Sequence, residues 1–454
     1  MTQPTLLWLR QDLRLHDQPA LVAAAHDGPV IPIYILDDDA PGQWKIGAAQ
    51  RWWLHHSLTS LAATLEDKGS RLVLRRGDAV TILRQLLADT GATRIHAIRH
   101  YEPWWRAAEA ELGDAIELHD GNHLARIEDV TTGAGTPFKV FSSFWKALQA
   151  HLPPADPLPA PDMVPAPDRW PDSDTLTTWD LLPSRPDWST AFADDWTPGE
   201  AEARDKAEHW PDDVTAYEQR RNLPSDEGTS RLSPHLHHGE ISPATVYHAL
   251  GRTADAAHFL REIAWRDFTA GVLLALPDYG SVNGRAKYDA LPWRDDAAAH
   301  RDLKAWEQGR TGYPIVDAGM RQLWTTGWMH NRVRMITASF LIKHLLIDWR
   351  TGERWFWDCL IDADYGNNSV NWQWIAGTGV DANMFSRIMA PLGQSAKFDA
   401  ADYIRRWVPE LAGLSDAAIH DPDDHGVRPP DYPAKIIGHR EARERALAAA
   451  RALA

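Results

Sequence analysis

The chain has 454 residues, which is too many for one small core, so two domains are expected. Its net charge of −16 argues against indiscriminate coating of nucleic acid, although a local basic groove is compatible with it. The single cysteine, Cys359, excludes a disulfide framework and a cysteine-based zinc cluster. With no secretory signal and no stretch near the ~20 apolar residues of a membrane span, we expect a soluble cytoplasmic protein.

Short apolar runs alternate with helical patterns over residues 1–130. Helical spacing is found at Ala48–Lys68 and Ala79–Thr90. The alternation predicts a parallel, Rossmann-like α/β sheet with helices on both faces and a ligand edge at the carboxyl ends of its strands. No GxGxxG follows the first run, so a dinucleotide fingerprint is absent. The predicted buried strands are Leu6–Leu9, Val30–Leu36, Arg71–Leu74 and Ile95–Ile98.

Residues 131–200 are predicted to be an interdomain linker, because prolines and aspartates crowd residues 152–200 and leave little room there for regular structure. Helical patterns dominate residues 201–454, and no strand pattern interrupts them, so the second domain is expected to be all-helical. The clearest predicted helices are Ala257–Leu276, Pro314–Thr326, His330–Asp348, Glu353–Ile361 and a final helix from His439.

Two tryptophan-rich blocks lie in this helical half. The first runs from Lys304 to Met335, and the second from Asp362 to Trp374. In both, indole rings stand beside carboxylates, asparagines and arginines. Core packing does not need the polar half of that mixture, which suits a deep pocket that holds a large aromatic cofactor and passes electrons.

The two blocks resemble those of the photolyase/cryptochrome flavoproteins. The opening Trp8-Leu-Arg-Gln-Asp-Leu-Arg14 and the segment Gly228-Thr-Ser-Arg-Leu-Ser233 resemble the same family, in the same order and over nearly the whole chain. Within the family the chain is most similar to class I-like cyclobutane pyrimidine dimer DNA photolyases. The resemblance implies an antenna-type α/β domain at 1–130, a linker at 131–200 and a helical FAD-binding catalytic domain at 201–454.

The resemblance also implies how FAD is held. Arg334 and Asp362 would form an ion pair over the isoalloxazine, Asp364 would lie at its polar edge and Asn368 would face N5. The hydroxyl groups and backbone N–H groups of residues 229–233 suit a diphosphate, although a plain helix N-cap would use the same residue types. The full predicted FAD set is Tyr217, Thr229, Ser230, Arg231, Leu232, Ser233, Phe259, Glu262, Arg266, Trp328, Asn331, Arg334, Asp362, Asp364 and Asn368.

A lesion site is implied on the next helix faces. Glu262, Trp265 and Arg266 share one face by their spacing, and in the family this glutamate holds the damaged bases while the tryptophan packs on them. Relatives that repair the (6-4) photoproduct have histidines in place of Asn331 and Met335, so a cyclobutane dimer is the expected substrate. The predicted catalytic residues are Glu262, Asn331, Met335 and Asn368, and the predicted DNA or lesion contacts are Arg221, Trp265, Met335, Trp374 and Arg387.

Trp372, Trp349 and Trp293 match the family's electron-transfer chain, and core packing is the alternative for each of them. A second, antenna chromophore is implied in the α/β domain. Tyr101-Glu-Pro-Trp-Trp105 replaces the Asn-Glu of folate-binding relatives, so deazaflavin, FMN or no antenna stay open ahead of folate. His235-Leu-His-His238 has metal-like spacing but is expected to be a helix-surface cluster, and no metal site is predicted.

The expected function is light-driven repair of cyclobutane pyrimidine dimers in UV-damaged DNA, by electron transfer from photoexcited reduced FAD to a flipped-out dimer. A monomer is expected, with no membrane partner. The first alternative is a cryptochrome-type photoreceptor without repair activity. Plant-type photoreceptors carry aspartate where this chain has Asn368, which favours repair. The second alternative, a flavin electron carrier unrelated to DNA, leaves Arg221 and Arg387 without a purpose.

Overall fold

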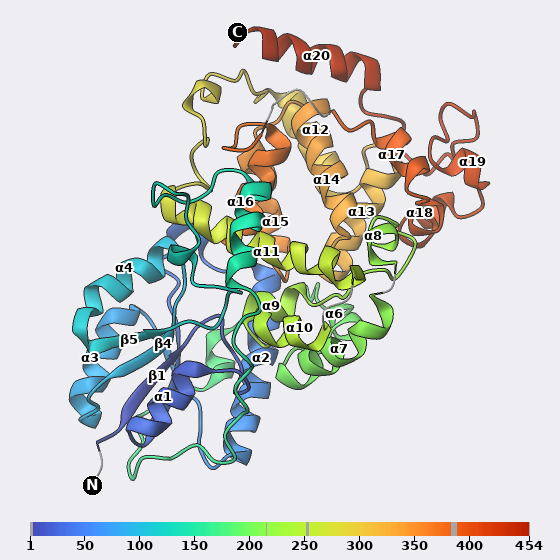
Figure 1. Ribbon diagram of the computed structural model, residues 1–454. Helices are drawn as coiled ribbons and strands as arrows, with labels where there is room; N and C mark the ends of the chain where they lie inside the picture. The colour runs from blue at the N-terminus through green and yellow to red at the C-terminus, as the bar shows by residue number, and fades with distance from the viewer. Residues whose placement is uncertain (1–2, 215, 251–253, 383–387, 454) are drawn as a thin grey trace.

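The computed structural model describes residues 3–214, 216–250, 254–382 and 388–453. Figure 1 shows a sheet-containing domain at the N-terminal end and a larger helical domain above it in the view. The predicted architecture, a parallel α/β domain followed by a helical domain, is confirmed in the described residues. None of the described helices is long and apolar enough to cross a membrane.

The sheet has five parallel strands in the order β3-β2-β1-β4-β5. The fifth strand was not predicted, because it lies at the edge of the sheet, is only half-buried and alternates polar with apolar residues instead of forming an apolar run. The third begins two residues later than predicted. The strands are β1 Thr5–Leu9, β2 Val30–Leu36, β3 Val73–Arg76, β4 Ile95–Ile98 and β5 Ile116–His119.

Apolar cores cover both faces of the sheet. Leu7 and Leu9 point into one core and Leu6 and Trp8 into the other, as alternation along a strand requires. This is why β1 is a continuous apolar run. The first core is shared with helices α1 Pro19–Asp27 and α2 Ala48–Asp67, and the second with α3 Ala79–Thr90 and α4 Pro103–Leu112.

Residues 131–200 are mostly irregular, but they contain two helices, α5 Phe141–Leu148 and α6 Phe192–Asp195. Little regular structure is predicted only for residues 152–200, so α5 lies before that stretch. Phe141, Phe144 and Leu148 recur at helical spacing and are buried in the core of the helical domain. Figure 1 shows α5 as the unlabelled teal helix between the two domains, beside α11.

No strand is found in the described part of the chain beyond His119. The predicted helix His330–Asp348 is α-helical only to Ser339 and continues as a π-helix over Phe340–His344. The remaining helices are α7 Glu200–Asp213, α8 Tyr217–Arg220, α9 Ser233–His238, α10 Pro243–Leu250, α11 Ala254–Ala275, α12 Ala297–Glu307, α13 Pro314–Thr326, α14 Asn331–Ser339, α15 Trp349–Cys359, α16 Tyr365–Ala376, α17 Pro391–Lys397, α18 Ala401–Trp407, α19 Asp416–Ile419 and α20 His439–Arg451.

The histidines of α9 are buried, so the expectation of a helix-surface cluster is wrong. His235 Nδ1 lies 2.5 Å from Glu240 Oε2, and His238 Nε2 lies 3.0 Å from the carbonyl oxygen of Ile361. His237 Nε2 lies 3.0 Å from Gln50 Oε1, on α2 of the other domain. Each ring has a polar partner at the boundary between the domains, which makes burial of a polar side chain tolerable.

Gly239 ends α9 at φ +68° and lies against the α/β domain. A Cβ built there would be 2.0 Å from the carbonyl oxygen of Gln11, whereas Gly91, at φ +67°, has open space around it. We predict that Gly239→Ala costs about 2–5 kcal/mol, from the left-handed backbone together with the clash. Gly91→Ala should cost only about 1–2 kcal/mol, from the backbone alone. Thermal unfolding of both variants checks this, and equal losses would contradict the close contact between the domains.

Candidate functional site

The centre of the candidate site is the buried carboxylate of Asp362. Its Oδ2 accepts a hydrogen bond of 2.8 Å from Arg334 Nη2 and one of 2.6 Å from Ser233 Oγ. Burial by itself would raise the pKa of Asp362, but the Arg334 charge and these hydrogen bonds lower it below its usual value. The residue is therefore an anion that joins α9, α14 and the turn before α16.

The second oxygen of this carboxylate lacks a partner. Asp362 Oδ1 is buried and has no hydrogen-bond partner among the described residues. Ser233 and Asn331 are exposed, although they flank the buried Asp362 and the half-buried Arg334. Trp328 lies beside them, its Nε1 3.4 Å from Ser233 Oγ. Polar groups of this kind fit a polar ligand that completes their hydrogen bonds.

The segment before α9 presents a cation over aromatic rings. Arg231 has φ +52°, and its guanidinium lies 4.2 Å from the ring centre of Trp196 and 5.4 Å from that of Trp328. Leu232 is buried below it, while Thr229 and Ser230 are half-buried. The segment thus combines one cation with two hydroxyl groups beside Ser233, which fits a diphosphate.

Tyr217 and Phe259 form an aromatic wall. Their rings meet edge to face at 5.3 Å, and Phe259 also lies 5.4 Å from Trp210. Both Tyr217 and Phe259 are buried in the core of the helical domain. The arrangement places Phe259 against other aromatic rings, so its predicted contact with FAD has no direct support in the geometry.

Glu262 and Arg221 are partners. Arg221 Nη1 donates a short hydrogen bond to Glu262 Oε1. The Arg221 side chain is 21% exposed and the Glu262 side chain is 33% exposed. The family resemblance predicts that Arg221 contacts the DNA backbone and that Glu262 holds the damaged bases. Their pairing places both predicted DNA-binding residues at one partly open point, between α8 and α11.

Trp265 and Arg266, which share a face of α11 with Glu262, contact different neighbours. Trp265 stacks on Phe141 of α5, with ring centres 3.9 Å apart and planes at 5°. Arg266 donates to the carbonyl oxygens of Asn122 and Leu236, at 3.2 and 3.0 Å. Arg266 therefore ties α11 to the α/β domain and to α9. Its predicted contact with FAD stays a prediction.

Asp364 and Asn368 lie at the start of α16. Asp364 caps the helix by accepting a hydrogen bond of 2.6 Å from the backbone N–H of Asn367. The Asn368 amide donates to the carbonyl oxygen of Glu353 at 3.2 Å. Burial raises the pKa of the Glu353 carboxyl well above its usual value. The sequence alone does not single out Glu353, because its helical spacing is that of any core-facing residue.

On α14, Met335 is half-buried, and its Sδ lies 3.8 Å from Arg332 Nη1. Trp374 is half-buried on α16. Both remain candidates for the lesion site. Arg387, the other predicted DNA contact, lies outside the described residues.

The three predicted electron-transfer tryptophans differ in burial. Trp372 and Trp349 are buried, whereas Trp293 is half-buried beside Tyr288 and Leu291. Gly352, one turn after Trp349 on α15, would place a Cβ 2.3 Å from the Trp372 ring, so that ring touches the α15 backbone. The order from Trp372 to Trp293 thus runs from the interior towards solvent.

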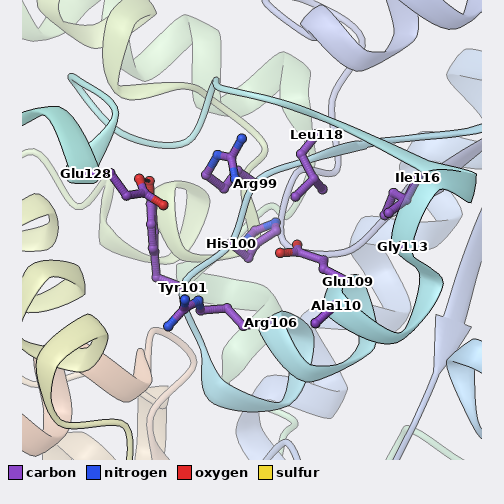
Figure 2. Close-up of a pocket in the computed structure, with 10 residues that line it drawn as sticks. All are labelled: Arg99, His100, Tyr101, Arg106, Glu109, Ala110, Gly113, Ile116, Leu118 and Glu128. Carbon is purple, nitrogen blue, oxygen red and sulfur yellow. Dashed lines mark hydrogen bonds between the residues drawn. The ribbon is translucent and has the colours of Figure 1, made fainter.

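A separate cavity of about 270 Å³ lies in the α/β domain (Figure 2). Figure 2 shows Tyr101 pointing towards Glu128, and the Tyr101 hydroxyl donates to Glu128 Oε2 at 2.7 Å. Arg99 and Arg106 also line the cavity. The cavity follows β4, on the carboxyl side of the sheet where the sequence placed a ligand edge.

Comparison with known proteins identifies the family. Residues 5–162 match the DNA photolyase family, and residues 259–452 match the FAD binding domain of DNA photolyase. A deoxyribodipyrimidine photo-lyase of Agrobacterium fabrum is 47% identical and covers 99% of this chain and 98% of its own. Cryptochrome-1 of Arabidopsis thaliana is 34% identical, covering 97% of this chain and 69% of its own.

Among solved structures, a bacterial class III photolyase from Agrobacterium tumefaciens is 47% identical, with a TM-score of 0.94, and covers 100% of this chain and 98% of its own. The chain belongs to the DNA photolyase family and carries its FAD-binding domain. The class I-like assignment is not confirmed, because this structural relative is a class III enzyme.

Glu102 provides a pH test of the boundary between the domains, where a small cavity brings it together with Arg266 and Asp364. Burial, together with the charge of Asp364, raises the pKa of Glu102 to about 8. The folded protein keeps this carboxyl protonated while the unfolded chain ionises near its usual value, so its contribution to stability is lost as pH rises towards 8. We predict that Glu102→Gln removes this part of the pH dependence.

The measurement is the melting temperature at pH 5 and pH 8. Relative to the wild type, Glu102→Gln should gain stability at the higher pH. Glu111→Gln is the control, because Glu111 is exposed on the same helix, α4. A wild-type profile in both variants would show that Glu102 ionises normally in the folded protein.

Proposed function

We propose that this protein is a deoxyribodipyrimidine photo-lyase, which uses light to repair cyclobutane pyrimidine dimers in UV-damaged DNA. The observation that carries the proposal is the Asp362–Arg334–Ser233 cluster, in a chain 47% identical over nearly its full length to a deoxyribodipyrimidine photo-lyase. When bound, reduced FAD supplies the light-driven electron that splits the dimer.

We assign the cradle of the flavin to the Asp362 cluster. The buried Asp362–Arg334 pair and Asn368 would orient the ring system, with Trp328, Asn331, Asp364 and Arg266 near it. Ser233, Thr229, Ser230 and Arg231 would hold the phosphates, because they supply hydroxyl groups and a cation. Asp362 Oδ1, which can only accept hydrogen bonds, would face a donor group of the ring system. Tyr217, Leu232 and Phe259 would close the wall behind them.

The DNA side of the site is assigned to the Arg221–Glu262 pair and its neighbours. Glu262 would accept hydrogen bonds from the flipped-out bases. Arg221 would then release Glu262 and contact a phosphate of the DNA backbone, as Arg387 would. Trp265, Met335 and Trp374 would line the lesion cavity. Flipping costs a few kcal/mol and costs least for damaged bases that are already unstacked, which contributes to selectivity.

Two further roles complete the proposal. Trp372, Trp349 and Trp293 would carry electrons between the interior and solvent, since the first two are buried and Trp293 is half-buried. The cavity lined by Arg99, Tyr101 and Arg106 is the candidate place for a second chromophore, with deazaflavin or FMN favoured over folate. The domain bounds 1–130, 131–200 and 201–454, a monomeric state and a cytoplasmic location belong to the same proposal.

A cryptochrome without repair activity is the second candidate, favoured by the 34% identity to Cryptochrome-1 of Arabidopsis thaliana. Asn368 and the Arg221–Glu262 pair favour repair over signalling. The two functions differ in one measurable respect, which is whether dimers disappear in the light.

We predict that Glu262→Gln lowers the repair of cyclobutane-dimer DNA about tenfold to a hundredfold, because a charged hydrogen-bond acceptor is lost. FAD should stay bound, since the variant leaves the Asp362 cluster intact. Repair per absorbed photon and the flavin absorption spectrum are the measurements. Glu218→Gln is the control, because Glu218 is exposed on the neighbouring α8. Undiminished repair by Glu262→Gln would remove this residue from the lesion site.

We also predict that Asn368→Asp shortens the lifetime of the reduced flavin in air. The substitution replaces an amide donor with a carboxylate beside the carbonyl oxygen of Glu353. The added negative charge would lie next to the electron-rich reduced flavin and disfavour it. The rate of reoxidation after photoreduction is the measurement. Asn371→Asp, an exposed change one turn later on α16, should leave the rate unchanged. Equal rates in both variants would contradict the placement of Asn368 at the flavin.

A further inference from the structure

Two histidines and a glutamate converge on one face of the sheet, outside the candidate flavin and DNA site. His96 lies on β4, and Glu117 and His119 lie on β5. In the parallel register His96 pairs with Glu117, and Ile98 pairs with His119. Residues two apart on a strand share a face, so the two strands present all three side chains on the same side. This is the side covered by α1, whose last residue is Asp27.

The donor atoms are close enough to share one ion. His96 Nδ1 lies 3.1 Å from His119 Nε2, which in turn lies 3.9 Å from Glu117 Oε1. One ligand atom from each residue fits within a span of 4.8 Å. A tetrahedral Zn²⁺ with ligands at about 2.0–2.2 Å separates them by about 3.3 Å. Small rotations of the exposed Glu117 side chain would therefore satisfy the geometry.

The surroundings of His96 are those of a metal ligand. If Nδ1 binds the ion, Nε2 carries the proton. It lies 3.3 Å from Asp27 Oδ2 without a hydrogen bond in this structure, so a small turn of Asp27 would bring the carboxylate into line with it. A carboxylate on the far nitrogen of a ligating histidine orients the ring and raises its basicity. A direct hydrogen bond between the two imidazoles would also explain their 3.1 Å contact, but it would explain neither the third ligand nor the aspartate behind His96.

The carboxylates around the site also agree with a cation. Arg94 holds only one oxygen of Glu117, Oε2, which leaves Oε1 turned towards His119. Asp27 is contacted from solvent by the exposed His26, at 3.3 Å. His96 is buried while the Glu117 side chain is partly exposed, so water can reach a fourth position.

We propose that His96, Glu117 and His119 form a binding site for a first-row divalent metal ion, best suited to Zn²⁺, with Asp27 supporting His96. The ion would fasten β5, the edge strand of the sheet, to β4. The sequence alone does not reveal this site, because the ligands come from two strands about twenty residues apart and form no local motif.

The test is Zn²⁺ titration of the full-length, FAD-loaded protein after dialysis against a chelator, followed by isothermal calorimetry and by the melting temperature. One tight site and a rise in melting temperature are expected in the wild type. His119→Gln and Glu117→Gln should each weaken that site at least tenfold and abolish the rise. His55→Gln is the matched control, a partly buried histidine on α2 of the same domain, and should behave as wild type.

Two further readouts keep the test decisive. Binding should weaken as pH falls below 6, because protons compete for both imidazoles. The flavin spectrum reports whether each variant is folded, and Glu117→Gln, an exposed substitution, serves if His119→Gln fails to fold. Absence of a tight site in the wild type, or a tight site that survives in Glu117→Gln and His119→Gln, would overturn the proposal. Equal loss in His55→Gln would mean adventitious binding to surface histidines.

Discussion

The arrangement of the helical domain depends on one buried negative charge. A carboxylate removed from water is costly unless charge and hydrogen bonds compensate it. Arg334 and Ser233 compensate one oxygen of Asp362 and leave the other without a described partner. This requirement joins three segments far apart in the sequence. It also leaves a polar opening that suits the cofactor of the family to which the chain belongs.

Buried polar groups at the boundary between the domains must also find hydrogen-bond partners. Arg266 binds carbonyl oxygens on both sides of the boundary, and the α9 histidines bind partners on α2 and before α16. Gly239 closes α9 where no side chain fits. Because these groups are buried at one boundary, a change in the α/β domain can alter the position of α9, and with it Ser233.

Much of this could be predicted from sequence, and the failures have physical reasons. Continuous apolar runs predicted four strands because both faces of the sheet are buried. The fifth strand escaped because an edge strand needs no such run. The family resemblance implied the Arg334–Asp362 ion pair, which the structure contains, but it assigned Ser233 to the phosphates and did not predict the hydrogen bond from Ser233 to Asp362. Spacing could not reveal the Arg221–Glu262 pair, the stacking of Phe141 on Trp265 or the burial of the α9 histidines, because those contacts arise only in the fold.

The measurement that tests the central claim most directly is photorepair by the purified wild-type protein. Reduced protein is incubated with DNA containing thymine cyclobutane dimers, in blue light or in darkness, and the remaining dimers are counted. Loss of dimers in the light alone is the predicted result. Dimers that persist in the light, while FAD is bound and can be photoreduced, would contradict repair and favour the cryptochrome function.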